Sequence, residues 1–337
     1  MAQRNPDQKD PVAGEVLARY LREQATEFLR ALRQHRESGS DEAAGPALAL
    51  RAAARRISGS LHTFRPLLDA EWSDTLRAEL AWLSGTLARE HGYAARLDRL
   101  IGALHRLSPA AAPHGRGGSV PAQSGGLTVG AAKAGALIER QLTLARTRAH
   151  STALQALGSS RFHAVADGVA VLASEVPLRK EAGGNRLEPF AADVEARLNE
   201  AVTALPLVRA GHPYNAEALL HGLAADAAPE SQDAPWHQVR LLLRLHRYAL
   251  EVIGTEAVDV RLLGAGRALD RHRDAAEAAS AAASAARTPR IAPATAYALG
   301  VLHADQRHEV EAARFAFQAV WQRSGSGTGS GRPVGAS

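Results

Sequence analysis

The sequence predicts an all-α protein, and three observations support this prediction. Alanine and leucine, which are strong helix formers, dominate the composition, whereas valine and isoleucine, which favour strands, are sparse. Aromatic residues make up only 4% of the 337 residues. Apolar residues recur at steps of three and four over long stretches of the chain. Two helical bundles packed side by side are the simplest architecture for such a chain.

The first helical half, 13–175, follows a polar tail at 1–12 that we expect to be disordered. Its first helix is expected after Pro11, in the stretch GEVLARYLREQATEFLRALRQH, and it ends before a turn-rich break at 37–46. The pair Arg65-Pro66 ends or kinks the second helix, because the residue before a proline disfavours helical geometry. The helices expected after the break are 47–64, 71–90, 96–107, 129–157 and 161–174.

A change of composition interrupts this first half. The stretch SPAAAPHGRGGSVPAQSGG, residues 108–126, is rich in Gly, Pro and Ser and cannot bury a core. We therefore expect a flexible linker over 108–128.

The second helical half, 188–323, starts after a loop-like segment at 176–187. A further loop at 227–235 is expected to lead into its most distinctive helix. The C-terminal stretch 324–337 is of low complexity and is expected to be disordered. The helices expected in this half are 187–205, 236–252, 255–286 and 294–322.

Composition limits the possible functions. The chain has no cysteine, which excludes disulfides and thiolate metal sites and fits a reducing compartment. The polar N-terminus does not resemble a signal peptide, and no window reaches about 18 uncharged apolar residues, so we expect no membrane-spanning segment and a cytoplasmic location. A formal net charge of +5 is compatible with a plain basic surface as well as with a polyanionic partner.

The stretch WHQVRLLLRLHRYALEV, residues 236–252, carries a row of cations, which we call the stripe. Its members His237, Arg240, Arg244 and Arg247 are separated by steps of three, four and three, which places them on one side of a helix. No acidic residue lies inside this row, and like charges at such spacing repel by about a few tenths of a kcal/mol per pair. The stripe therefore requires carboxylates from other helices, a cavity, or an anion such as phosphate, which arginine binds through a fixed fork of donors. The plainer alternative is that its arginines extend to a surface or pair with distant acids.

Cations at comparable spacing occur on other predicted helices. Each set alone is most simply a solvated surface feature, but sets on several helices favour a shared basic cavity. The scarcity of aromatic residues argues against the base stacking that single-stranded nucleic acids require. The sets are Arg51, Arg55 and Arg56; Arg140 and Arg148; and His303, Arg307 and Arg314.

The sequence does not indicate catalysis. His272 and Asp274 form an H-x-D pair, but no second set at ligand spacing accompanies them, so we expect no metal site and interpret His272 as an interhelical hydrogen-bonding residue or a cavity ligand. The chain has no P-loop, no Rossmann glycine motif, no G-x-S-x-G and no H-E-x-x-H. Neither a cofactor nor an enzymatic activity is expected, because no nucleophile with an adjacent base can be named.

The stripe resembles a signature helix of the CHAD family, the conserved-histidine α-helical domain. His237, Arg240, Arg244 and the pair Arg247-Tyr248 match the family pattern, whereas Leu241 replaces a cation. Two further stretches also resemble the family. They are Leu269, His272 and Asp274, with Asp270 in a glycine position, and the C-terminal Ala313, Arg314, Phe317 and Trp321.

The first half resembles the family less closely. The positions of Arg51, Arg55 and Arg56 match, as does the stretch FRPLL at 64–68. Leu48 stands where the family has its first signature histidine, and His91-Gly92-Tyr93-Ala94 replaces the usual Arg-Asp-x-Asp. The resemblance therefore implies that one of two pseudo-symmetric sites is partly dismantled.

What the resemblance implies is a pair of four-helix bundles related by pseudo-two-fold symmetry, with basic residues around a central cavity. It also implies association with inorganic polyphosphate, either at polyphosphate granules or beside triphosphatase domains. We therefore expect a cytoplasmic, non-enzymatic polyphosphate-binding protein of bacterial type. The alternatives are a structural or adaptor protein with reduced anion binding and a nucleic-acid-binding protein; a hydrolase acting on polyphosphate is a more distant alternative. Nucleic acid is not the expected partner, because no reading motif is present.

Overall fold

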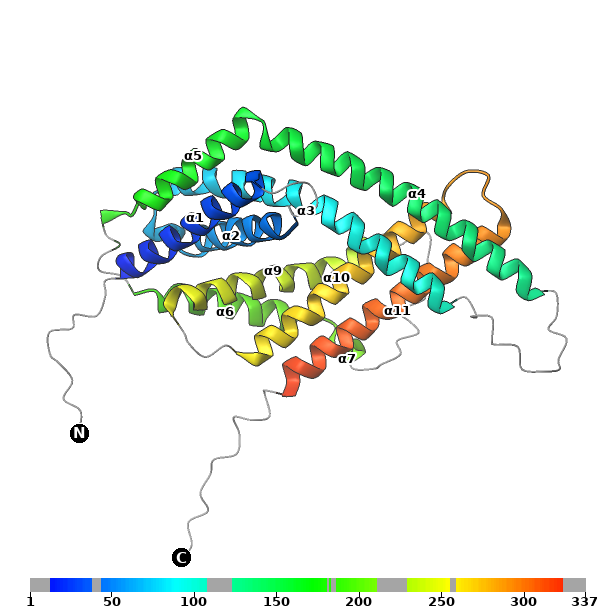
Figure 1. Ribbon diagram of the computed structural model, residues 1–337. Coiled ribbons are helices and arrows are strands. Elements are labelled where there is room, and N and C mark those ends of the chain that lie inside the picture. Colours follow the sequence, from blue (N-terminus) through cyan, green and yellow to red (C-terminus); the bar gives the residue numbers. More distant parts are fainter. Residues whose placement is uncertain are drawn as a thin grey trace, which may run out of the picture. The chain divides into compact units, whose positions relative to one another are not determined.

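The protein is helical throughout the residues that its computed structural model describes (Figure 1). An isolated β-bridge between Leu68 and Leu178 is the exception to helix, turn and loop in this part of the chain. The predicted all-α class is therefore confirmed. The two predicted tails and most of the predicted linker lie outside the described residues. Those residues are 13–37, 44–107, 123–180, 182, 186–210, 229–254 and 259–323.

The chain divides into two compact units. Unit 1 comprises the described residues within 1–89, 149–199 and 242–257, and unit 2 those within 90–148, 200–241 and 258–337. The sequence suggested two consecutive halves instead, with a division between 175 and 188. The difference arises because three long helices, α3, α4 and α9, each contribute residues to both units.

Unit 1 is built on the apolar faces of its helices. Leu17, Leu21 and Phe28 of the first helix are fully buried, and they share a core with side chains from the next helices, such as Ile57 and Phe162. Burial of such faces is the main source of helix stability in a protein. The elements of this unit are α1 (Ala13–Glu37), α2 (Ala44–Thr63), η1 (Arg65–Leu67), α5 (Ser160–Ser174) and the parts of α3 (Ala70–Leu107), α4 (Gln123–Leu157), α6 (Glu188–Thr203) and α9 (Pro229–Ile253) that fall in its ranges.

Unit 2 contains a long helical pair, α10 (Val260–Ala286) and α11 (Pro293–Arg323), which lie side by side (Figure 1). Asp259 caps α10, because its carboxylate accepts hydrogen bonds from the backbone N–H groups of Arg261 and Leu262 at 2.8 and 3.4 Å. The buried face of α10 is largely alanine, which allows neighbouring helices to approach closely. The remaining elements are α7 (Leu207–Ala210) and the other parts of α3, α4, α6 and α9.

Most predicted helices exist, but three boundaries were wrong. The helices expected at 71–90 and 96–107 are a single helix, α3, because Gly92 costs only about 1 kcal/mol in a helix whose flanks favour it. α4 begins at Gln123, so the end of the predicted linker is helical. α9 begins at Pro229, seven residues before the expected start. Proline suits the first position of a helix, and here Pro229 occupies that position while Pro235 lies inside the helix.

A close approach in unit 2 leads to a stability prediction for α4. A Cβ atom added at Gly130 would lie 2.5 Å from the backbone oxygen of Ala294 at the start of α11. We expect Gly130→Ala to lower the free energy of unfolding by about 1–3 kcal/mol, because a backbone group cannot move aside without shifting the helix. Urea denaturation of the variant measures this loss.

Gly135 provides the matched control on the same helix. A Cβ atom there would meet only the side chains of Leu104 and Ile101, at 3.6 and 3.8 Å, which is ordinary contact. Gly135→Ala is therefore expected to raise the free energy of unfolding by about 0.5–1 kcal/mol, since alanine restricts the unfolded chain. Equal effects of the two substitutions would contradict the close approach at Gly130.

Candidate anion-binding site

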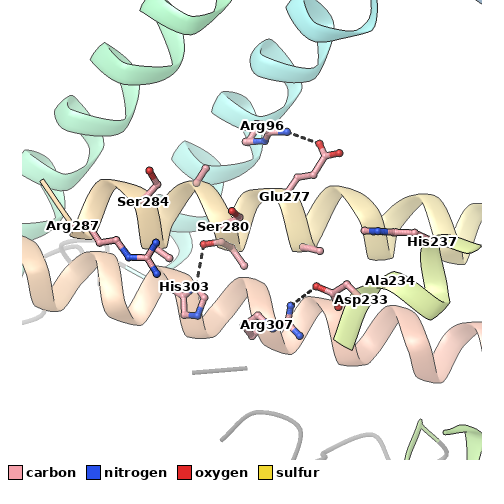
Figure 2. A pocket seen from close by; sticks show the side chains of 14 residues that line it. Arg96, Asp233, Ala234, His237, Glu277, Ser280, Ser284, Arg287, His303 and Arg307 are labelled. Carbon is pink, nitrogen blue, oxygen red and sulfur yellow. Dashed lines mark hydrogen bonds and ion pairs between the residues drawn. The ribbon is translucent and has the colours of Figure 1, made fainter. Parts of the chain in front are cut away.

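A cavity of about 750 Å³ lies within unit 2, along the pair α10 and α11 (Figure 2). The first turns of α9 and one arginine of α3 complete its wall. Its cationic or partly cationic lining residues come from α3, α9 and α11 and from Arg287, the residue that caps the C-terminus of α10. The lining residues are Arg96, Asp233, Ala234, His237, Ala276, Glu277, Ala279, Ser280, Ala281, Ala283, Ser284, Arg287, His303 and Arg307.

The wall that α10 contributes consists mainly of alanine and serine side chains. From Ala276 to Arg287 this wall runs for three turns of helix, or roughly 16 Å. Two carboxylates also line the cavity, and each is bound to an arginine: Glu277 to Arg96, and Asp233 to Arg307. The cavity is thus an elongated space with small side chains along one wall and cations around it.

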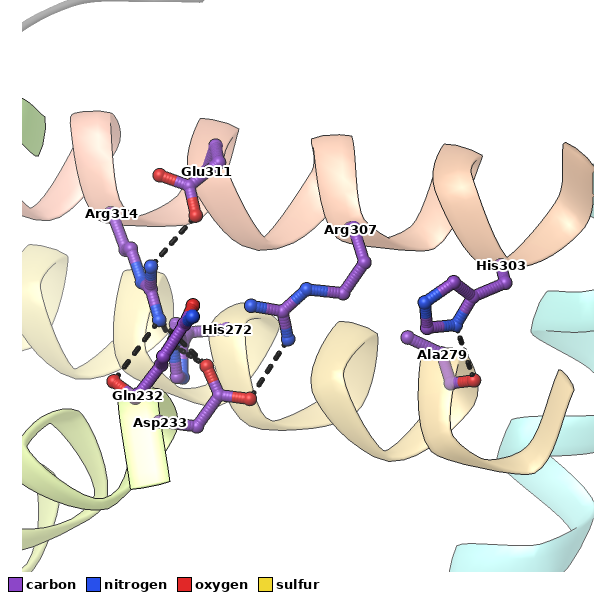
Figure 3. Close-up of polar contacts among 8 residues, drawn as sticks. All are labelled: Gln232, Asp233, His272, Ala279, His303, Arg307, Glu311 and Arg314. Atoms are coloured by element: carbon purple, nitrogen blue, oxygen red, sulfur yellow. Dashed lines mark hydrogen bonds and ion pairs between the residues drawn. The ribbon is translucent and has the colours of Figure 1, made fainter. Parts of the chain in front are cut away.

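Arg307 is the buried cation of this cavity. Its side chain is only 1% exposed, and its Nη1 donates a hydrogen bond of 2.9 Å to Oδ2 of Asp233 (Figure 3). Nε and Nη2 have no hydrogen-bond partner among the residues that the structure describes. These two atoms form one edge of the planar guanidinium, and such an edge binds two oxygens of one phosphate or carboxylate.

Asp233 connects Arg307 to a second buried arginine (Figure 3). Its Oδ1 accepts a hydrogen bond of 2.6 Å from Nη2 of Arg314, and Nη1 of Arg314 also donates to Glu311 at 2.7 Å. Burial by itself would raise the pKa of Asp233, but the contact with His272 and the charge of Arg307 outweigh it and hold the pKa well below its ordinary value. Two arginines and two acids therefore form a buried cluster without net charge.

His272 completes this cluster and is almost fully buried. Its ring stacks on Trp236 with centroids 5.6 Å apart, and its Nε2 lies 3.3 Å from Nε of Arg314. The same Nε2 also lies 3.4 Å from Oδ1 of Asp233, so this ring nitrogen contacts both a donor and an acceptor of the cluster. Burial lowers the pKa of His272 to about 4, against the opposing effect of Asp233, so that this histidine is neutral at pH 7.

The lowered pKa of His272 predicts a pH-dependent stability. The unfolded chain takes up a proton near the ordinary pKa of 6.5, whereas the folded chain does so only near 4. The contribution is therefore present above pH 6.5 and is lost as the pH falls towards 4, which lowers the free energy of unfolding by ~3 kcal/mol. Urea unfolding at pH 7, 5.5 and 4.2 measures the loss. His272→Gln should show a shallower decline over the same range, and an identical decline would assign the effect to other groups.

The other predicted site residues of unit 2 lie in different surroundings. His237 and His303 line the cavity, and Nδ1 of His303 lies 2.9 Å from the backbone oxygen of Ala279. Arg240 forms an ion pair of 2.6 Å with Asp270 of α10. Arg140 and Arg148 are exposed on α4. Of the predicted residues, therefore, the structure brings His237, His303 and Arg307 together at the cavity, with His272 and Arg314 in the adjoining cluster.

The remaining predicted residues belong to unit 1. Nε of Arg56 donates a hydrogen bond of 2.8 Å to Glu251, and the Arg56 guanidinium lies over the ring of Tyr248 at 5.9 Å. The hydroxyl of Tyr20 donates to the same Glu251 oxygen at 3.0 Å. Arg51 and Arg55 are half-buried on α2, as are Arg244 and Arg247 on α9. The stripe is thus divided between the two units, and convergence of all the cation sets at one place stays a prediction.

The acids that accompany the stripe were not predicted from the sequence. With α9 extended to Pro229, Asp233 lies four residues before His237, and Glu251 lies four residues after Arg247. The stripe is therefore a row of cations with an acid at each end, and each acid binds an arginine of another helix. The spacing of four residues was the available signal. Arg96, Arg287, Glu277 and Glu311 were also missed. Glu311 lies three residues before Arg314 on the same helix, which was an available signal, whereas the sequence carries no local signal for the other three.

Comparisons with known proteins agree with this fold. The family model described as CHAD domain matches residues 23–257, a range that ends before α10 begins. A solved structure of PptA from Streptomyces chartreusis is 65% identical in sequence to this chain. The match covers 92% of this chain and 99% of the PptA chain, with a TM-score of 0.79.

A solved structure of the CHAD domain from the plant Ricinus communis is 19% identical, with a TM-score of 0.50 over 93% of this chain and 95% of its own, and shows likeness of fold alone. No curated protein matches the chain. Among the described helices, none combines the length and apolar character that crossing a membrane requires. The family model covers more than half of the chain, which confirms the resemblance seen in the sequence, and the chain therefore belongs to the CHAD domain family.

Proposed function

We propose that this protein binds inorganic polyphosphate without cleaving it, and that the cavity of unit 2 is a binding site. The unpartnered edge of the Arg307 guanidinium carries this proposal. A buried guanidinium edge without an acceptor is costly, and an oxyanion with two oxygens on one phosphorus atom satisfies both donors. Both atoms are themselves buried, so an oxyanion that enters the cavity reaches them when the side chains over this edge move aside.

The form of the cavity favours a chain of phosphates over a single one. Its wall on α10 extends for about three helical turns, from Ala276 to Arg287. Arg307 is buried, whereas Arg287 is exposed, so a chain bound along this wall meets cations at more than one point. His237 and His303 add donors that strengthen when protonated.

Membership of the CHAD family supports the same ligand class. We include the wider set of predicted cations in the proposal, as residues that contact a longer chain, and we place the protein in the cytoplasm at polyphosphate granules. The wider set is Arg51, Arg55, Arg56, Arg140, Arg148, Arg240, Arg244 and Arg247. His272 and Arg314 belong to the buried cluster and support the cavity from there.

A structural or adaptor role is the second candidate, and a specific observation favours it. Leu48 and Leu241 stand where the family pattern has a histidine and a cation, and both are about half exposed. Arg240 is already bound to Asp270. If the stripe serves mainly the fold, Arg240→Glu/Arg244→Glu will lower the free energy of unfolding more than it weakens polyphosphate binding.

Titration with long-chain polyphosphate at two salt concentrations tests the proposed function. Single-stranded DNA of equal charge is the competitor, and orthophosphate release is followed in the same samples. We expect binding that DNA does not match and no orthophosphate release. Binding no tighter than that of DNA would contradict the proposal, because a purely electrostatic surface does not distinguish the two polyanions. Release of orthophosphate would contradict its non-enzymatic part.

Arg287 offers a first variant for locating the site. Arg287→Ala removes an exposed cavity cation, so we expect polyphosphate affinity to fall several-fold while the free energy of unfolding stays nearly constant. Arg186→Ala in unit 1 makes the same change of charge on a side chain that is 80% exposed and does not line the cavity. Equal effects of the two variants on affinity would indicate that only net charge matters.

A further inference from the structure

We infer that Asp233 is a positioning residue of the unit 2 cavity: although it is negatively charged, it strengthens the binding of an anion by holding Arg307 with one guanidinium edge free of any acceptor among the described residues. This inference rests on the proposed function, since it concerns the same site. The negative charge of Asp233 alone would predict weaker binding of an anion, whereas the inference predicts that Asp233 strengthens it.

The geometry of Asp233 divides its two oxygens between two arginines. Oδ2 accepts from Nη1 of Arg307 at 2.9 Å, and Oδ1 accepts from Nη2 of Arg314 at 2.6 Å. A carboxylate that bound Arg307 with both oxygens would occupy a whole edge of the guanidinium. Because Arg314 takes the second oxygen, Arg307 is held through a single nitrogen, and Nε and Nη2 stay without a partner among the described residues.

Asp233 is itself held rigidly. It lies in the first turns of α9, it is 4% exposed, and the buried Trp236 follows three residues later on the same helix. Trp236 stacks on His272 and meets Phe317 edge-on with centroids 5.8 Å apart. An arginine side chain loses rotamer freedom when it is fixed, and this cost is already met before the ligand arrives.

The repulsion between Asp233 and a bound anion is small, because the charge of Asp233 is already balanced. Arg307 and Arg314 both lie against its carboxylate, and Glu311 balances the second arginine. Removal of the Asp233 charge would leave the two arginines facing each other. Arg307 would then turn towards Glu311, which lies four residues further along α11, and its free edge would leave the cavity.

Polyphosphate affinity of Asp233→Asn, compared with Glu277→Gln, tests the inference. Both substitutions remove one negative charge from the cavity wall. We expect Asp233→Asn to bind long-chain polyphosphate about tenfold more weakly and Glu277→Gln to bind it more tightly, since the latter frees Arg96. Equal or tighter binding by Asp233→Asn would overturn the inference, because the acid would then act by repulsion only.

A double variant shows whether Asp233 acts through Arg307. In the Arg307→Lys background, which has no guanidinium edge to position, Asp233→Asn should cause little further loss of affinity. A full tenfold loss in this background would contradict the positioning role. A merely structural role predicts that the two losses add.

Folding and the ligand class are controlled separately. Thermal unfolding identifies the variants that are folded at the temperature of the titration, and if Asp233→Asn is not folded, Asp233→Glu takes its place. That variant keeps the charge but displaces the carboxylate by one methylene, so a loss of affinity supports positioning and an unchanged affinity overturns it. If the unmodified protein binds polyphosphate no better than DNA, the proposed function and the inference are both overturned. If the unmodified protein binds polyphosphate selectively and the Asp233 variant binds it with the same affinity, the inference alone is overturned.

Discussion

Replacement of Arg314 by leucine is expected to lower the free energy of unfolding by about 3–5 kcal/mol. Arg314 is nearly buried, and its guanidinium contacts two carboxylates, Asp233 at 2.6 Å and Glu311 at 2.7 Å. Leucine would leave Glu311 without a cation of its own in a setting where burial already raises its pKa. Removing one partner from a buried ion pair costs more than the pair itself contributes. Urea denaturation at pH 7 measures the change.

The double variant Arg314→Leu/Glu311→Leu distinguishes this cause from simple loss of packing. It removes one positive and one negative charge and leaves Asp233 with Arg307. We expect it to be more stable than Arg314→Leu alone, because no uncompensated charge stays buried. If the double variant is the less stable of the two, the cost arises from packing over the Trp236 ring, which the Arg314 guanidinium covers at 5.2 Å.

The buried cluster also shows how far the sequence predicts this site. The spacing of the stripe predicted a helix with a row of cations, and the resemblance to the CHAD family predicted the fold. The sequence also raised the possibility that distant acids bind these cations, and Arg240 with Asp270 and Arg56 with Glu251 are such pairs. What the sequence left open was which cations are neutralised and which retain a free edge. That depends on contacts between helices far apart in the chain.

The start of α9 was the decisive local error. The prediction of a loop at 227–235 and a helix from Trp236 left Asp233 in the loop, and the acid then had no defined place beside the stripe. In the structure Pro229 occupies the first position, and Asp233 falls one turn before His237. A single misplaced boundary therefore hid the residue that binds both buried arginines of α11.

Contacts between distant residues could not be predicted from spacing at all. Arg96 of α3 reaches Glu277 of α10, and Arg287 lines the cavity from the last turn before α11. Neither residue belongs to a periodic set in the sequence. Their places follow from the packing of α3 and α10 around a shared core, in which Leu100 and Ala278 are both fully buried.

Arg307→Lys is expected to weaken polyphosphate binding by about 10- to 100-fold. Lysine keeps the positive charge, but it has no planar edge and cannot offer two parallel donors to one phosphate. The loss of a hydrogen bond to a charged group corresponds to ~1.5–3 kcal/mol, and 1.4 kcal/mol is about a tenfold change in affinity. Because net charge is unchanged, competition by single-stranded DNA should change far less than polyphosphate affinity does. Polyphosphate binding within twofold of the unmodified protein, in a variant that unfolds at the same temperature, would mean that the Arg307 edge does not hold the ligand.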